Sequence, residues 1–293
     1  MMSAEHPLHS CRMKLGWAKR HLKVLEREVG LYLNSDPYPL RREADASGSK
    51  YLFRISVRYA LPRERWSLLA GDCIHNARSS LDHAVCGIEA WSTGKPASEI
   101  RRSEYPICPN PEAFKAAQSK IGNLPPAAQA LIEREQPFVR LKSPSSDPLA
   151  ILQELDIRDK HRSLSLTTYF AMFRVVDSTG RMIDPPAGYE VFPGYFKDGA
   201  VVAALPIHDP DPKHGTGVFT KVEVVFDEPG VPGIFRDVTV VEILYRMVLR
   251  AASIINELDA YLGKEGFPPS KALEEMAWHT SPTEDKDRTR LPP

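Results

Sequence analysis

Residues 66–91 (WSLLAGDCIHNARSSLDHAVCGIEAW) contain the densest group of side chains that could do chemistry. If this segment is a helix, with about 100° between successive residues, its polar residues gather on one side. That side holds Asp72, His75, Asn76, Ser79, Asp82 and His83, with Arg78 on its flank. These side chains form hydrogen bonds, exchange protons or bind metals. We expect this face to point toward another element or a cleft, because each such group needs a partner once it is buried.

Two other groups of residues must position this polar face. The same segment carries an apolar stripe at helical spacing, formed by Ile74, Ala77, Leu81, Ala84, Val85 and Ile88. A second helix is predicted at residues 149–164, and near its end it carries Asp159, Lys160, His161 and Arg162, the sequence DKHR. We expect the polar face of the first helix to turn toward this second helix.

The rest of the chain mixes helical and strand-like patterns. Amphipathic helices are expected at residues 11–33 and 238–262. Residues 34–50 have the composition of a loop, and residues 51–60 alternate like a strand with one apolar face. Residues 164–226 contain four strand-like segments separated by Gly, Pro and Asp. The strand at 51–60 either joins that sheet or forms a hairpin of its own.

These patterns predict an α+β fold, in which a helical bundle core carries an inserted antiparallel β-sheet. One domain is expected over residues 1–293. Within it, the helical core occupies 10–163 and 236–264, the β-rich insertion 164–230 and a flexible tail 267–293. Shorter helices are predicted at 111–120 and 125–135.

The helix at 238–262 has one irregular position. Its outer side is predicted to be solvated and to hold Glu242, Arg246, Arg250 and Glu257. Asp259 falls within the apolar band instead. Either this carboxylate pairs with a basic group of the core or the helix frays there, and fraying is the preferred interpretation.

Composition sets broad limits on function. The net charge of +0 gives no general argument for binding nucleic acid or an anionic membrane. No run approaches the roughly 18 apolar residues that a membrane span needs, so we expect a cytoplasmic protein without membrane contact. The four cysteines show no C-x-x-C spacing and are expected to be small buried thiols.

Arg78 and His83 form an Arg-x-x-x-x-His spacing that resembles the motif of the HEPN superfamily of helical-bundle proteins. In that family the Arg and His cut RNA without a metal, usually in a dimer. The resemblance implies that Arg78 stabilises a phosphate and that His83 is a general acid or base, with RNA and a second copy of the chain as partners and no cofactor. The chemistry is reasonable, because guanidinium groups bind phosphate oxygens and His titrates near neutrality. The departure is Ser79, where the family often has a larger polar residue.

A wider pattern extends over roughly residues 10–165. The segments GDCIHNARSSLDH, EQPF at 135–138 and LQELDIRDKHR resemble a group of bacterial and phage proteins of unassigned function. This pattern is more specific than the HEPN spacing, but it implies no activity.

Two other interpretations of the polar face stay open. Histidines and carboxylates from two bundle helices can bind Zn, Fe or Mn. His75 and His83 are roughly 12 Å apart along a helix axis, so one ion cannot easily bind both. A site at His208, Asp209, Asp211 and His214 is a weaker metal candidate, because turn residues of this kind are usually solvated.

The other interpretation is a buried polar network without catalysis. In it, Arg78 or Arg162 pairs with Asp82, Asp156 or Asp159 and fixes how the helices pack. The leading active hypothesis is a HEPN-like ribonuclease or a degenerate RNA-binding relative, and the competing class is a non-catalytic ligand-binding or interaction protein. A ribonuclease needs Arg78 and His83 exposed in a cleft, whereas the structural network needs both buried and paired within one chain.

Overall fold

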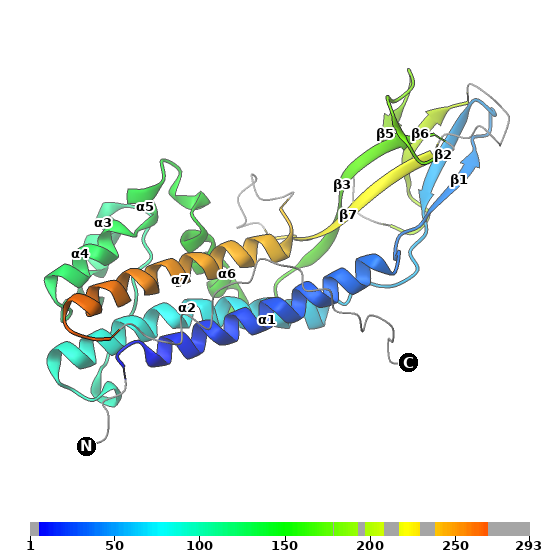
Figure 1. Ribbon diagram of the computed structural model, residues 1–293. Helices are drawn as coiled ribbons and strands as arrows, with labels where there is room; N and C mark the ends of the chain where they lie inside the picture. The colour runs from blue at the N-terminus through cyan, green and yellow to red at the C-terminus, as the bar shows by residue number, and fades with distance from the viewer. Residues whose placement is uncertain (1–5, 178, 193–196, 208–216, 229–237, 269–293) are drawn as a thin grey trace, which may run out of the picture.

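The structure is a computed structural model that describes residues 6–177, 179–192, 197–207, 217–228 and 238–268. It has two parts, an elongated helical body and a β-arm that rises from one end of that body (Figure 1). Long helices make most of the body, and the strands of the described residues lie in the arm or run up into it, with the lower ends of β3 and β7 packed on the core of the body. The predicted α+β class, with a helical bundle and an antiparallel β-structure, is therefore confirmed.

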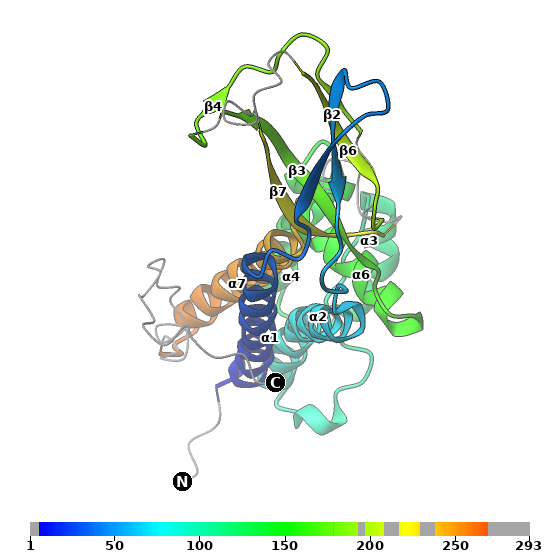
Figure 2. The same cartoon turned by 90° about the vertical axis from the view of Figure 1, so that its right-hand side faces the viewer.

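Four long helices build the body: α1 (His9–Asn34), α2 (Arg63–Thr93), α6 (Pro148–His161) and α7 (Val240–Lys264). Helices α1 and α2 run antiparallel, so the first turn of α1 lies beside the C-terminal half of α2. Ser10 contacts His83 at one end, and Glu28 accepts hydrogen bonds from Arg65 and Trp66 at the other. Figure 2 shows α2 with α1 on one side and α6 on the other.

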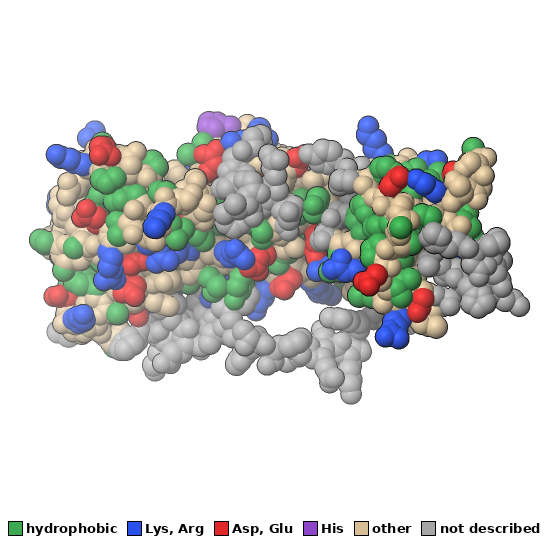
Figure 3. Space-filling model, turned by 90° about the horizontal axis from the view of Figure 1, so that it is seen from above, with side chains coloured by type: hydrophobic (Ala, Val, Ile, Leu, Met, Phe, Trp, Pro, Cys, Tyr) green, Lys and Arg blue, Asp and Glu red, His purple; other side chains and the backbone are tan. Residues whose placement is uncertain are grey.

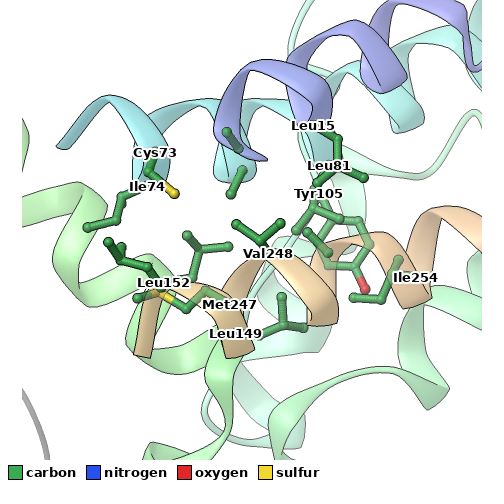
Figure 4. Packing of buried hydrophobic residues seen from close by; sticks show 14 of the residues in the cluster. Leu15, Cys73, Ile74, Leu81, Tyr105, Leu149, Leu152, Met247, Val248 and Ile254 are labelled. Atoms are coloured by element: carbon green, nitrogen blue, oxygen red, sulfur yellow. The ribbon is translucent and has the colours of Figure 1, made fainter. Parts of the chain in front are cut away.

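The core of the body lies where the apolar stripes of these helices meet (Figure 4). Leu15 of α1, Leu81 of α2, Leu152 of α6 and Val248 of α7 are fully buried. Burying one such side chain stabilises the fold by about 1.5–3 kcal/mol. The apolar stripe predicted for residues 66–91 is buried throughout, so the opposite face of α2 is the one left for polar contacts.

Short elements link α2 to α6. They are the 3-10 helices Ala97–Glu99, Gln118–Lys120 and Pro144–Ser146, and the helices α3 (Pro111–Ala117), α4 (Pro126–Arg134) and α5 (Pro137–Arg140). Proline opens each of the three α-helices, where its missing N–H has no helical partner to lose. Asn110 caps α3 and Asp147 caps α6, so side chains define both starts.

The β-arm contains two antiparallel sheets. One has the order β1-β2-β6-β5, formed by β1 (Leu40–Ala44), β2 (Lys50–Ile55), β6 (Val201–Pro206) and β5 (Glu190–Val191). The other has the order β4-β3-β7, formed by β4 (Met182–Ile183), β3 (Leu166–Val176) and β7 (Gly217–Phe226). Their shared core is a small separate cluster that includes Phe53, Ile55, Val175 and Leu205. The strand predicted at 51–60 is shorter than predicted, because β2 ends at Ile55; it forms a hairpin with β1 and also joins β6.

Two local predictions were wrong. Residues 34–50 are not all loop, because β1 lies within them; it is an edge strand whose Arg41, Arg42 and Glu43 are exposed, which hides any apolar alternation. The second helix ends at His161 rather than Leu164, and the chain turns there into β3.

Two predictions for the C-terminal helix were also wrong. Arg250 is buried rather than solvated, and its guanidinium donates to the Glu135 carboxylate at 2.8 Å. Asp259 does not fray: α7 continues to Lys264, and Arg12 donates to Asp259 at 2.6 Å. In both cases the partner comes from a distant part of the chain, which helical periodicity cannot reveal.

Two further observations concern membrane spanning and the distribution of side chains on the surface. No helix in the described part of the chain is both long and apolar enough to cross a membrane. On the face in Figure 3, acidic and basic side chains are interspersed over the helical end, while hydrophobic side chains gather over the arm.

Candidate functional site

The buried side chain of Arg78 is the centre of the candidate site. Its guanidinium donates from Nε to Gln153 at 2.9 Å and from Nη1 to Asp82 at 2.5 Å. From Nη2 it donates to Glu104 at 3.0 Å and to the Tyr105 carbonyl at 2.9 Å. Only 5% of the side chain is exposed. These five residues, which we call the Arg78 network, join α2, α6 and the segment before α3.

The acidic members of this network differ in how they are held. Asp82 also accepts the backbone N–H of Tyr105 at 2.9 Å. Burial raises the pKa of Asp82, and the nearby Arg78 opposes that rise. Burial would likewise raise the pKa of Glu104, but hydrogen bonding and charge from Lys120, 2.7 Å away, bring it below its usual value. Two cations and two carboxylates therefore balance one another at the edge of the core.

His83 lies on another flank of α2. Its Nδ1 forms a 2.7 Å hydrogen bond with the Ser10 hydroxyl on α1. Partial burial lowers the pKa of His83, and the charge of Lys14 lowers it further. The ring is half-buried and stands beside α1 rather than α6. The lowered pKa favours the neutral form of the His83 imidazole, which has one hydrogen-bond partner, Ser10.

Arg78 and His83 point to different neighbours. Residues five apart on a helix are roughly 140° apart around its axis. Accordingly, the contacts of Arg78 are with α6 and residues 104–105, while His83 contacts α1. Within one chain, the two side chains do not converge on a common hydrogen-bond partner among the described residues.

Only part of the polar face meets the second helix: Arg78 and His75 contact α6, whereas His83 and Asp72 lie toward α1. His75 Nδ1 lies 3.5 Å from the buried carboxylate of Asp156, which Lys160 also approaches to 2.6 Å. Asp159 packs against Gly71, where an added Cβ would lie 2.5 Å from its carboxylate oxygen. Burial and the neighbouring charges of Asp156 and Asp72 raise the pKa of Asp159.

The remaining predicted site residues are more exposed than Arg78 and have fewer contacts. Asp72 is exposed, 3.9 Å from His21, and its carbonyl accepts from the side chain of Asn76. Ser79 is half-buried. We call the accessible residues Asp72, His75, Asn76, Ser79 and His83 the open stripe of α2.

The end of the DKHR segment leaves the site. His161 is exposed, and its side chain forms no hydrogen bond or ion pair with another residue of the described chain. Arg162 pairs with Glu228 at 2.6 Å, so it does not join the carboxylates of α2 and α6. Glu228 also accepts the backbone N–H of Ser165, which fixes the turn from α6 into β3.

Sequence reasoning missed several partners of the site. Glu104 lies in an irregular segment without periodicity, Lys120 ends a short predicted helix whose packing the sequence does not show, and Ser10 precedes the predicted start of the first helix. Gln153 could have been found, because it stands three residues before Asp156 and seven before Lys160 and so shares their helix face.

Among the described residues, no three His, Cys, Asp or Glu side chains converge as a metal ion requires. The residues His208, Asp209, Asp211 and His214 lie outside the described part of the chain. All four cysteines are free thiols, and burial raises the pKa of Cys11 and of Cys73 to about 12.

A second buried network contains the first half of the EQPF segment. Glu135 accepts from Arg250, while Gln136 accepts the N–H of Cys108 and donates to the carbonyls of Pro106 and Ile132. Both side chains are buried. These residues therefore hold the turn between α4 and α5 against α7.

Comparison of the chain with protein-family models, curated proteins and solved structures finds no match in any of the three. The HEPN resemblance and the wider motif resemblance stay predictions.

Proposed function

We propose that this protein is a non-catalytic binding protein in which the Arg78 network of α2 has a structural role. One observation carries the proposal: the guanidinium of Arg78, the residue with the best chemical case for holding a phosphate, is buried and committed to four partners within its own chain. Arginine has five N–H donors, so little capacity is left for a substrate.

Releasing Arg78 for catalysis would be costly. Breaking a fully buried ion pair destabilises a protein by about 3–5 kcal/mol, and the half-exposed carboxylates of Asp82 and Glu104 place the cost here toward the lower end of that range. A phosphate on the exposed side of α2 would also have to compete with Asp82 and Glu104, two carboxylates already in contact with the guanidinium. The geometry thus favours a structural role for Arg78 over a catalytic one.

Other residues of the wider pattern have structural roles as well. Gly71 admits the Asp159 side chain, and Asp82 fixes the backbone of Tyr105. Glu135 and Gln136 hold the chain between α4 and α5. A pattern whose members bind one another supports a shared scaffold better than a shared reaction.

The test is an RNA-cleavage assay of the purified chain on mixed RNA, with EDTA and separately with Mg²⁺. We expect no cleavage above a buffer control. Cleavage that disappears in both Arg78→Ala and His83→Ala, while a folded Arg65→Ala control retains it, would overturn the proposal. Arg65 is a suitable control because it lies on α2 and is largely exposed.

RNA binding without cleavage is a second candidate function, and one surface feature favours it. Trp17 of α1 is 47% exposed, and the Arg20 guanidinium stands 5.1 Å from its ring centroid. Lys14, which acts on His83, belongs to the same helix. An exposed indole beside cations is the combination that stacks single-stranded bases.

This second candidate predicts that Trp17→Ala weakens binding of a fluorescent single-stranded RNA by about fivefold or more, since stacking of one base contributes about 1–3 kcal/mol. Tyr59→Ala is the matched control, because Tyr59 is also an exposed aromatic residue but lies on the linker before α2. Equal binding by wild type and Trp17→Ala removes the candidate. Light scattering of the same samples tests the dimer that the HEPN resemblance implies.

A further inference from the structure

A cavity of about 670 Å³ lies where the β-arm joins the helical body. Its walls come from the α1–β1 loop, the linker from β2 to α2, the base of β3, the segment before β6 and the end of β7. Figure 1 shows these elements meeting at the root of the arm. Small-molecule sites have volumes of roughly 300–1,000 Å³ and favour such junctions.

Hydroxyl groups line the inner side of this cavity. Tyr38 and Thr168 are both buried, and the Thr168 hydroxyl lies 3.4 Å from that of Tyr38. The Tyr38 hydroxyl in turn contacts the Tyr32 hydroxyl at 2.9 Å, and Tyr32 also reaches the carbonyl of Tyr59. The cavity therefore ends on a connected chain of hydroxyls that can donate or accept.

Positive charge stands at the rim. Arg63, the first residue of α2, and Lys197 both line the cavity, against one carboxylate, Asp227. Neither cation is in an ion pair with another described residue. Arg63 reaches the inner hydroxyls electrostatically, because its charge lowers the pKa of Tyr32 against the larger raising effect of burial. The positive end of the α2 dipole adds to the same field.

The segment that carries Lys197 is held against the arm. The Asp198 carboxylate accepts the backbone N–H of Val57 at 2.9 Å, and the Gly199 N–H donates to the Ile55 carbonyl at 2.9 Å. Val57 itself lines the cavity, together with the apolar residues Ala60 and Leu61. A cationic rim and an apolar wall are thus fixed beside each other.

We infer that this cavity binds a small organic anion, whose carboxylate or phosphate group lies between Arg63 and Lys197 and whose apolar part packs on Val57 and Leu61. A single negative charge matches the lining, since two cations face one carboxylate. This inference is independent of the proposed function, because the cavity shares no residue with the Arg78 network or the open stripe.

The experiment is isothermal titration calorimetry of the full chain with three probes of one ring system: naphthoate, naphthyl phosphate and neutral naphthol. We expect at least one anion to bind about tenfold more tightly than naphthol, and the tighter anion identifies the head group. Arg63→Gln and Lys197→Gln should each weaken that anion by about tenfold, the loss typical of one hydrogen bond to a charged group.

Arg41→Gln is the matched control, because Arg41 is an exposed arginine of β1 that does not line the cavity. It should leave the affinity unchanged, and all three variants should keep the thermal unfolding midpoint of the wild type. Equal binding of naphthol, equal weakening by Arg41→Gln, or no binding of either anion would each overturn the inference.

Discussion

The two flanks of helix α2 carry similar residue types but are built in opposite ways. On the flank facing α6 and residues 104–105, Arg78 is buried, Asp82 is half-buried, and each nitrogen of the guanidinium has an acceptor. On the open stripe, Asp72 is 61% exposed and His75 is 56% exposed, each with one partner beyond 3 Å. Both flanks carry side chains that form hydrogen bonds and hold charge, but they differ in the number of partners that each side chain has.

This difference separates structural from available side chains. Removing a buried arginine that has four partners destabilises the fold, because each acceptor loses a hydrogen bond and is left without a full replacement partner. A half-exposed histidine or aspartate is free to exchange its partner for water or a ligand at little cost. The residue types identify α2 as the central helix. Only the burial of the side chains and the number of their partners distinguish its two flanks.

The largest effect is expected from Arg78→Ala. The substitution leaves Asp82, Glu104, Gln153 and the Tyr105 carbonyl without their common donor. We expect the free energy of unfolding to fall by about 3–5 kcal/mol, toward the lower end of that range. Urea denaturation followed by circular dichroism measures it.

Arg65→Ala provides the matched control, because it removes an arginine from the same helix whose ion pair with Glu28 is exposed. Its loss should stay within about 1 kcal/mol. If both substitutions cost the same, the two flanks of α2 do not differ in the way the contacts indicate.

Arg78→Lys sharpens the comparison by keeping the charge and removing the planar fork. One ammonium group cannot reach partners on α2, on α6 and at residues 104–105 together. We expect a loss of about 2 kcal/mol, intermediate between wild type and Arg78→Ala, in the same urea titration. A lysine variant as stable as the wild type would show that charge alone, rather than the set of hydrogen bonds, matters at this position.

The fold was largely predictable because its helices are long and periodic. The apolar stripe of residues 66–91 and the band of 238–262 gave the right helices, with ends displaced by a few residues. Strand β1 escaped because an edge strand can be charged along its whole length. Local pattern works where one face must be buried, and fails where burial does not constrain the residue types.

The residue types of the candidate site could be predicted from the sequence, but the burial and the tertiary partners of each side chain could not. The Arg78–Asp82 pair could be foreseen, since residues four apart share a helix face. The contributions of Glu104 and Ser10 could not, because they depend on tertiary packing of segments 26 and 73 residues away in sequence from their partners. Arg250 shows the same limit. Its position on the helix predicted exposure to solvent, whereas its guanidinium donates to the Glu135 carboxylate.

A smaller effect, dependent on pH, is expected at His83. Its folded pKa lies below the ordinary 6.5, chiefly through burial. Just below pH 6.5 the unfolded chain therefore binds a proton that the folded protein does not, so stability is full above this pH and declines as the pH falls. His83→Gln should remove that part of the decline, and at neutral pH it should cost about 0.5–1 kcal/mol through the Ser10 contact.

The measurement is the free energy of unfolding of wild type and His83→Gln at pH about 7.5 and about 5.5. His6 gives a second contribution of the same sign, since burial lowers its pKa too. His6 lies near Arg12 and Asp259, away from Ser10. The decline should therefore shrink in His83→Gln without vanishing, and an undiminished decline would place His83 in solvent.

The smallest single effect is expected from His75→Ala, yet this position gives the finest test of the comparison. Asp156 is almost fully buried and has two basic neighbours, the imidazole of His75 at 3.5 Å and the ammonium of Lys160 at 2.6 Å. Removing the exposed imidazole leaves the lysine in place, so the loss should be below about 0.5 kcal/mol. Lys160→Ala alone should be similarly mild. The double variant strips Asp156 of both neighbours, and its loss in urea denaturation should exceed the sum of the single losses by about 1 kcal/mol or more. Simple additivity would mean that Asp156 is solvated, and the boundary between the closed and open flanks of α2 would then have to be drawn on the α6 side of this carboxylate.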